Sequence, residues 1–185
     1  MVWRLPVPRR GRVLLSQLVY RNPPIPPERV VVTMQALEEA GVKTVLMGGW
    51  GVDALVGRQL RPHSDIDLLA DESEFERAIE VLKRLGYEPW NHDSGPGPIG
   101  NLHVSAAQTL RDGALRVVEL HATDLGQVEP TEGKVAGKSV ACLTAEHQLR
   151  AQQVIGRTWT PQRRLNRQRN LAAVQGALRR GPERV

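Results

Sequence analysis

Two aspartates separated by one residue, Asp65 and Asp67, follow a basic segment and begin an apolar stretch. In a β-strand their side chains project from the same face, about 7 Å apart at the backbone. Carboxylates at that spacing can converge on divalent cations, and hard oxygen ligands suit magnesium. Two such ions stabilise the attacking and leaving oxygens of an in-line displacement. Taken alone, the pair also fits solvent-facing acids on a half-buried strand.

A glycine pair upstream favours the first interpretation. Gly48 and Gly49 follow an apolar run, 42–47, that predicts a strand, and they precede a short helix predicted over 50–56. Glycine lets the backbone approach a phosphate closely, and the N–H groups that open a helix favour negative charge. This order of elements predicts a site for a metal-bound nucleoside triphosphate.

The basic loop before Asp65 supplies further candidates. Arg61 and Ser64 can contact triphosphate oxygens, the first through its charge and the second through its hydroxyl. Arg58 lies farther from the aspartates in sequence, and both phosphate contact and a solvated loop fit it.

A third carboxylate, Glu119, interrupts an otherwise apolar row on one face of the strand predicted over 115–121. Burying an unpaired carboxylate is costly. Near two cations Glu119 would be satisfied and would stay ionised, ready to accept a proton from a hydroxyl. Its alternative role is a sheet-edge acid paired with Arg116 or Lys138.

Other reactive residue types have simpler explanations. Asp53 falls in the first turn of the short helix, where it complements the helix dipole, and Trp50 either packs against the sheet or walls the nucleotide site. His63 and His121 are expected to be hydrogen-bonded structural histidines, with assistance to an acceptor hydroxyl as the alternative. Cys142 is expected to be a buried thiol.

The elements that must position these residues predict an α+β (mixed α/β) fold, with a small twisted mixed sheet of about four to five strands and flanking helices. Helices are expected over 27–40, over 73–86 with Ser73 as the N-cap, from Thr144 onward, and over 162–178. A hairpin is expected from strands 102–106 and 115–121, and a short extended segment over 134–140.

The expected organisation has three parts. A Pro/Arg-rich N-terminal extension covers 1–26, a core covers 27–142, and a C-terminal helical annex covers 143–185. The segment 91–100, rich in glycine and proline, is expected to be an irregular loop that can serve as a lid.

Composition excludes several classes of protein. No run approaches the roughly 18 apolar residues of a membrane span. The single cysteine excludes a disulfide framework and fits a reducing, cytoplasmic setting.

The two ends of the chain are basic. Residues 1–22 hold five arginines and no acid, and residues 150–185 hold nine arginines and one acid. Nucleic-acid contact, a charged partner and solvated arginine all remain open. Seven aromatic residues offer few platforms for stacking on bases.

The glycine pair, short helix and Asp-x-Asp strand resemble the minimal nucleotidyltransferase signature of the polymerase-beta superfamily, including the fifteen residues between Gly49 and Asp65. More narrowly, 48–53, 57–59 and 61–67 resemble the aminoglycoside 2''-adenylyltransferase and lincosamide nucleotidyltransferase group. A weaker resemblance continues through 117–121 and 135–146, so that it covers about 28–155 in all.

The resemblance implies a nucleotidyltransferase fold and a third carboxylate from a neighbouring strand, which Glu119 matches, although many relatives have aspartate there. One departure lies in 165–171, where similar proteins often carry an Asp-Arg-x-Asp-like segment and this chain has no acid. If those acids bind a cationic acceptor in relatives, the acceptor here differs.

The implied activity is metal-dependent transfer of a nucleoside monophosphate, AMP from ATP or from another NTP, to a hydroxyl of a small molecule such as an aminoglycoside- or lincosamide-like antibiotic. The expected catalytic and metal-binding residues, with two Mg²⁺ ions, are Asp65, Asp67 and Glu119, and the expected nucleotide-binding residues are Gly48, Gly49, Arg61 and Ser64.

Two alternatives remain open. In the first, the acceptor is a protein or an RNA end, as the basic termini suggest. In the second, the chain is a non-catalytic, antitoxin-like partner protein. The sequence predicts no membrane association, does not favour nucleic acid, and leaves the acceptor, the base and the oligomeric state open.

Overall fold

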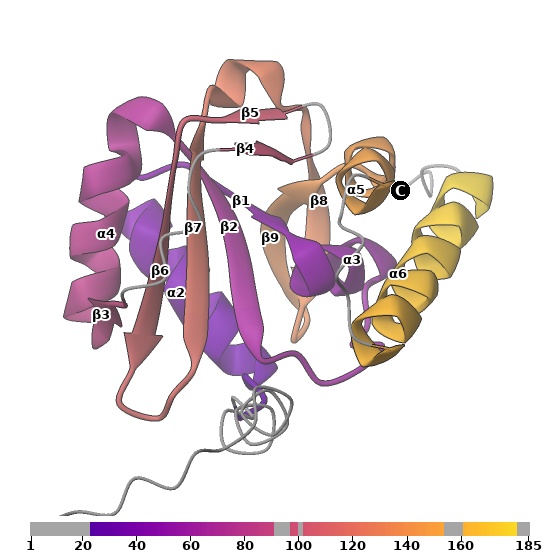
Figure 1. The fold of residues 1–185 in the computed structure, drawn as a ribbon, viewed down its shortest axis with the longest axis horizontal. Helices are drawn as coiled ribbons and strands as arrows, with labels where there is room; N and C mark the ends of the chain where they lie inside the picture. Colours follow the sequence, from indigo (N-terminus) through magenta and orange to yellow (C-terminus); the bar gives the residue numbers. More distant parts are fainter. Residues whose placement is uncertain (1–22, 91–96, 100–101, 154–160, 181–185) are drawn as a thin grey trace, which may run out of the picture.

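The computed structural model describes residues 23–90, 97–99, 102–153 and 161–180. One mixed sheet in the order β3-β6-β7-β2-β1-β9-β8 forms its centre, and a two-stranded sheet, β4-β5, lies across one end (Figure 1). The strands are β1 (Thr44–Met47), β2 (Asp65–Asp71), β3 (Tyr87–Pro89), β4 (Gly97–Ile99), β5 (Leu102–Val104), β6 (Ala106–Asp112), β7 (Val117–Thr123), β8 (Pro130–Val135) and β9 (Lys138–Leu143). The α-helices are α2 (Pro27–Glu39), α3 (Gly48–Val56), α4 (Phe75–Arg84), α5 (Ala145–Gln153) and α6 (Pro161–Arg180), with 3-10 turns at Glu72–Glu74 and Leu125–Gln127.

The alternation of apolar and acidic residues in β2 decides which way its side chains face. Ile66 and Leu68 are fully buried, whereas Asp65 and Asp67 are half-buried. Because side chains alternate along a strand, the two acids share the opposite face. β2 pairs antiparallel with β1 and parallel with β7, which places this acidic face at the centre of the sheet.

The apolar face of the sheet packs against α2 and α4, which lie side by side on it (Figure 1). The main core joins Leu37 of α2 and Leu82 of α4 to Leu46, Leu68 and Leu120 of the sheet. Burial of each such side chain contributes about 1.5–3 kcal/mol. This core holds β1, β2 and β7 rigidly against one another.

The acidic face is only partly covered. A smaller apolar cluster joins β1, β2 and β9 to β5 through Val45, Leu69, Leu143 and Leu102. α3, α5 and α6 pack together beside β8, on the other side of the molecule from α4 (Figure 1). Among the described residues, no helix is both long and apolar enough to cross a membrane.

The mixed α/β fold class is confirmed, and the sheet has seven strands where four to five were expected. The segment 134–140 is not one extended piece, because β8 and β9 form a hairpin that turns at Ala136 and Gly137. Both residues have positive φ, 49° and 75°, as in the tight turns that join antiparallel strands. The pair Ala-Gly is a weaker turn signal than Asn-Gly or Asp-Gly.

The hairpin around Asp112 is confirmed, but its first strand is β6, in place of 102–106. The Asp112 carboxylate sets the turn, because it accepts hydrogen bonds from the backbone N–H of Ala114 at 3.0 Å and of Arg116 at 2.9 Å. Residues 102–104 pair instead with 97–99. Part of the expected loop 91–100 is therefore a strand, and 91–96 lie outside the described residues.

Ser73 is not the N-cap of the second long helix. The Asp71 carboxylate accepts hydrogen bonds from the Ser73 backbone N–H at 3.0 Å and its hydroxyl at 2.6 Å, and α4 starts after the 3-10 turn. Phe75, Ile79 and Leu82 lie on the buried side of α4.

The cap at Thr144 is confirmed, since the His147 N–H donates to its hydroxyl at 3.4 Å. In this helix Leu149 is half-buried and Gln148 is fully buried. Residues 1–22 of the expected extension lie outside the described residues. Ile25 is buried in the main core, and its N–H donates to the His63 carbonyl at 2.7 Å.

The turn from β1 into α3 requires glycine for two reasons. Gly48 has φ of 62°, and a Cβ there would overlap the Asp67 carboxylate. Gly57, which ends α3, has φ of 76°, but a Cβ there would meet nothing within 4 Å. Both glycines thus have a positive φ, but only Gly48 lacks the space for a side chain.

We expect Gly48→Ala to lower the free energy of unfolding by about 2–4 kcal/mol, through positive φ and displacement of Asp67. Gly57→Ala is the matched control. Its free energy of unfolding should fall only by the cost of a positive φ for alanine, about 1–2 kcal/mol. Denaturant unfolding of both variants measures the difference. Equal losses would contradict the overlap with Asp67.

The single cysteine, Cys142, is fully buried, and burial raises the pKa of its thiol to about 12. We expect a thiol reagent at about pH 8 to leave the native protein unlabelled. The same reagent should label the protein once it is denatured, which serves as the control. Rapid labelling of the native protein would show that β9 is not buried as described.

Candidate active site

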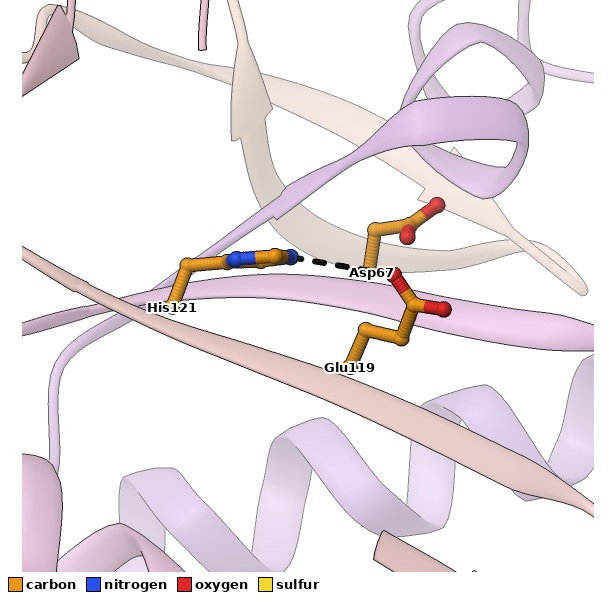
Figure 2. A group of neighbouring side chains, drawn as sticks. All are labelled: Asp67, Glu119 and His121. Carbon is orange, nitrogen blue, oxygen red and sulfur yellow. Dashed lines mark ion pairs between the residues drawn. The ribbon is translucent and has the colours of Figure 1, made fainter. Parts of the chain in front are cut away.

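The acidic face brings together three side chains from two strands. Asp67 on β2 and Glu119 on β7 are direct partners in the parallel pairing. His121 lies two residues beyond Glu119, and the ligating atoms of the three side chains all lie within 4.8 Å of one another. Figure 2 shows the two carboxylates close together, with the His121 ring directed toward them.

Asp65 lies on the same face of β2, two residues before Asp67, and its backbone partner on β7 is Val117. It stands outside the group of ligating atoms within 4.8 Å, which comprises Asp67, Glu119 and His121 in the described part of the chain. Its charge nevertheless raises the pKa of Asp67. Asp65 thus belongs to the same electrostatic cluster but not to its tightest part.

Burial and the neighbouring carboxylates together control the protonation of Asp67. Burial first, and then the charges of Asp65 and Glu119, raise its pKa well above the ordinary value. The Arg61 guanidinium and a hydrogen bond from the Gly49 backbone N–H act in the opposite direction. A divalent cation would cancel the repulsion, and carboxylate oxygens are suitable ligands for it. The donor set therefore fits a divalent metal.

His121 was not among the residues expected to form the site. Its side chain is 10% exposed, and burial lowers its pKa to about 4. It is therefore neutral near physiological pH, with a ring nitrogen that can accept a hydrogen bond or ligate a metal. The signal that points to it in the sequence is period two, because Glu119 and His121 must share one face of a strand.

The glycine turn fits closely around this cluster. A Cβ at Gly49 would overlap the His63 ring and would lie 3.1 Å from Nη2 of Arg61. Any side chain at Gly49 would therefore displace a residue beneath the turn. Only a residue without a side chain lets the Gly49 N–H approach the Asp67 carboxylate, to which it donates.

A buried pair supports the turn from below. Nε2 of His63 lies 2.6 Å from Oδ2 of Asp53, and both side chains are at most 2% exposed. Asp53 is not in the first turn of its helix, because α3 begins at Gly48, so the dipole interpretation is wrong and the carboxylate binds a histidine instead. His63 is a structural histidine, as expected. Trp50 is buried beside it, with ring centroids 4.9 Å apart, and packs in the core.

The predicted phosphate-contacting residues lie on the loop that this pair anchors. Arg61 is half-buried, and burial lowers its pKa while Asp65, Asp53 and Asp67 act in the opposite direction. Its guanidinium remains charged at physiological pH, and Nη1 donates to the Pro62 carbonyl at 3.0 Å.

Two further loop residues differ in exposure. Ser64 is half-buried immediately before β2. Arg58 is exposed, and its backbone N–H donates to the Asp53 carbonyl at 3.2 Å, which closes the end of α3. The loop therefore places Ser64 at the start of the acidic strand, with Arg58 at the surface.

Comparison with known proteins gives concordant results. A family model described as aminoglycoside-2''-adenylyltransferase matches residues 29–169. A lincosamide resistance protein from Staphylococcus haemolyticus is 34% identical over 68 residues, which are 37% of this chain. The match spans 42% of that relative's length.

Two solved structures share the fold. The lincosamide antibiotic adenylyltransferase LnuA, bound to lincomycin, superposes with a TM-score of 0.63 at 20% identity, covering 82% of this chain and 99% of its own. ANT(2'')-Ia in complex with adenylyl-2''-tobramycin superposes with a TM-score of 0.56 at 16% identity, covering 83% of this chain and 97% of its own. At these identities the likeness shows the nucleotidyltransferase fold. Because the family model spans most of the sequence, including both acidic strands and the glycine turn, the chain belongs to the aminoglycoside-2''-adenylyltransferase family of nucleotidyltransferases.

Proposed function

We propose that this protein transfers AMP from ATP, in a reaction that requires a divalent metal, to a hydroxyl of a small-molecule antibiotic. The single observation that carries the proposal is the register of β2 and β7, which pairs Asp67 with Glu119. With Asp65 on the same face, three carboxylates adjoin a glycine turn. Family membership supports the reaction class.

In the proposed reaction, the acceptor hydroxyl oxygen attacks the α-phosphorus of ATP. The bond to the bridging oxygen of the β-phosphate breaks, and pyrophosphate leaves. Metal ions held by Asp65, Asp67 and Glu119, two Mg²⁺ in our proposal, would stabilise the negative charge on the attacking and leaving oxygens.

Glu119 is the proposed acceptor of the hydroxyl proton. Its side chain is 37% exposed, so a hydroxyl arriving from solvent can reach it. Asp67 is less suited to that role, because the Gly49 N–H already donates to it and the Arg61 charge also favours its ionised form. Both carboxylates are thus proposed metal ligands, and Glu119 has the additional task of accepting the proton.

The proposed triphosphate contacts are Gly48, Gly49, Arg61 and Ser64. Arg61 lies close enough to Arg169 of α6 for the two positive charges to act on each other, which adds to the effect of burial in lowering the pKa of Arg61. Two guanidinium groups near each other, beside the carboxylate cluster, are suited to bind the negative charge of a triphosphate.

For the acceptor, the relatives suggest an antibiotic of the lincosamide or aminoglycoside class. α6 carries several arginines and no acid. A polycationic aminoglycoside would find no carboxylate on this helix, whereas a lincosamide carries less positive charge to be balanced. We therefore propose a lincosamide-like acceptor before an aminoglycoside.

The test is incubation of the full chain with Mg²⁺, ATP labelled at the α-phosphate, and a panel of lincosamides, aminoglycosides, RNA and cell extract. The proposal expects an adduct that carries the label with a lincosamide, and no transfer from ATP labelled at the γ-phosphate. Labelled RNA or protein would identify the alternative acceptor. Absence of any adduct under all conditions would overturn the proposed activity.

We expect Asp67→Asn to lower kcat/KM by about 100-fold or more, because a ligand of the charge-stabilising ion is lost. Asp71→Asn is the matched control, since Asp71 shares the strand and the face but bonds Ser73 and Leu125. The control should retain most of the activity. Similar losses in both variants would point to a general structural effect, and full activity in Asp67→Asn would exclude the proposed metal site.

A further inference from the structure

We propose that His121 is a direct ligand of the cation bound by Asp67 and Glu119. The resulting mixed carboxylate and imidazole site would favour a first-row transition cation over Mg²⁺. This inference rests on the proposed function for the presence of a cation at this place in the fold. It assigns to the site a nitrogen ligand and a metal preference that three carboxylates alone would not give.

The backbone determines where the imidazole lies. In the parallel pairing, Asp67 is opposite Glu119 and Leu69 is opposite His121. Glu119 and His121 therefore project from the same face of β7, Glu119 level with Asp67 of β2 and His121 two residues farther along the strand. The ligating atoms of the three residues lie within 4.8 Å of one another, and Figure 2 shows the ring pointing toward the carboxylates.

The residues paired with His121 on the neighbouring strands offer its ring no hydrogen bond. Its backbone partners on the two neighbouring strands are Leu69 and Ala107, whose side chains offer no hydrogen bond. Its Nε2 is 4.0 Å from Oε2 of Glu119, too far for a hydrogen bond but suited to two ligands of one ion. The ring is nine-tenths buried, with its side-chain nitrogen directed at a carboxylate pair.

Ligand chemistry turns this geometry into a metal preference. Mg²⁺ binds oxygen almost exclusively and keeps much of its water, whereas imidazole suits zinc and the later first-row cations. A site that includes His121 should therefore bind Co²⁺ or Zn²⁺ much more tightly than Mg²⁺. Co²⁺ is the useful probe, because its visible absorption reports nitrogen ligation directly.

The experiment uses the full chain freed of metal with a chelator and then titrated with Co²⁺ or Mg²⁺, by calorimetry and visible spectroscopy. We expect His121→Asn to weaken Co²⁺ binding by about tenfold or more and to change the Co²⁺ spectrum, with little change in Mg²⁺ binding. His103→Asn is the control, because His103 is an exposed histidine on β5. It should behave as the wild type.

A second variant covers the case in which His121→Asn does not fold. His121→Asp replaces the nitrogen ligand with oxygen, and it should shift the preference from Co²⁺ toward Mg²⁺. An unchanged Co²⁺ spectrum and an unchanged ratio of affinities in the folded His121 variants would overturn the inference. Metal binding that depends on His121, in a protein that transfers no nucleotide, would support the inference and reject the proposed function. Nucleotide transfer by a protein whose metal preference does not change in the His121 variants would support the proposed function and reject the inference.

Discussion

Repulsion between carboxylates held on one face of β2 and β7 is the constraint on which the rest of the site depends. The parallel pairing sets Asp67 opposite Glu119, with Asp65 two residues away, and backbone hydrogen bonds prevent these strands from moving apart. Burial of Asp67 and, after it, the charges of Asp65 and Glu119 raise the pKa of this carboxyl group. The Gly49 N–H and the Arg61 guanidinium offset part of this repulsion. What remains favours a cation, and this is the physical basis of the proposed chemistry.

The surrounding fold keeps the carboxylates in place despite that repulsion. The opposite face of the sheet is sealed by α2 and α4, so the strands cannot rotate to expose the acids further. Below the glycine turn, Asp53 holds His63, and the Ile25 N–H holds the carbonyl of the same histidine. The loop that carries Arg61 and Ser64 is thereby fixed to the chain on two sides.

Much of this arrangement follows from local patterns in the sequence. Period two places Asp65 and Asp67 on one face and predicts that Glu119 shares a face with His121, and the glycine pair identifies the turn. Features that depend on contacts between distant segments could not be predicted in this way. The partner of Asp53 lies ten residues away across a loop, the partner of Asp67 lies on another strand, and the β8-β9 hairpin turns on an Ala-Gly pair. The proximity of His121 to Asp67, on which its proposed metal-binding role rests, appears only once β2 and β7 are paired.

The central claim is that Asp67 is destabilising unless a cation is bound. The folded state raises its pKa, so the folded protein binds more protons than the unfolded chain between the two pKa values, and stability falls as pH rises through that window. Asn at this position keeps an acceptor for the Gly49 N–H and removes the charge. The most direct measurement is the thermal midpoint of the wild type and of Asp67→Asn near neutral pH, first with EDTA and then with a divalent cation. We expect the variant to be more stable in EDTA, and we expect the cation to stabilise the wild type more than the variant. A wild type that is already the more stable protein in EDTA, and that gains nothing from the cation, would contradict the central claim.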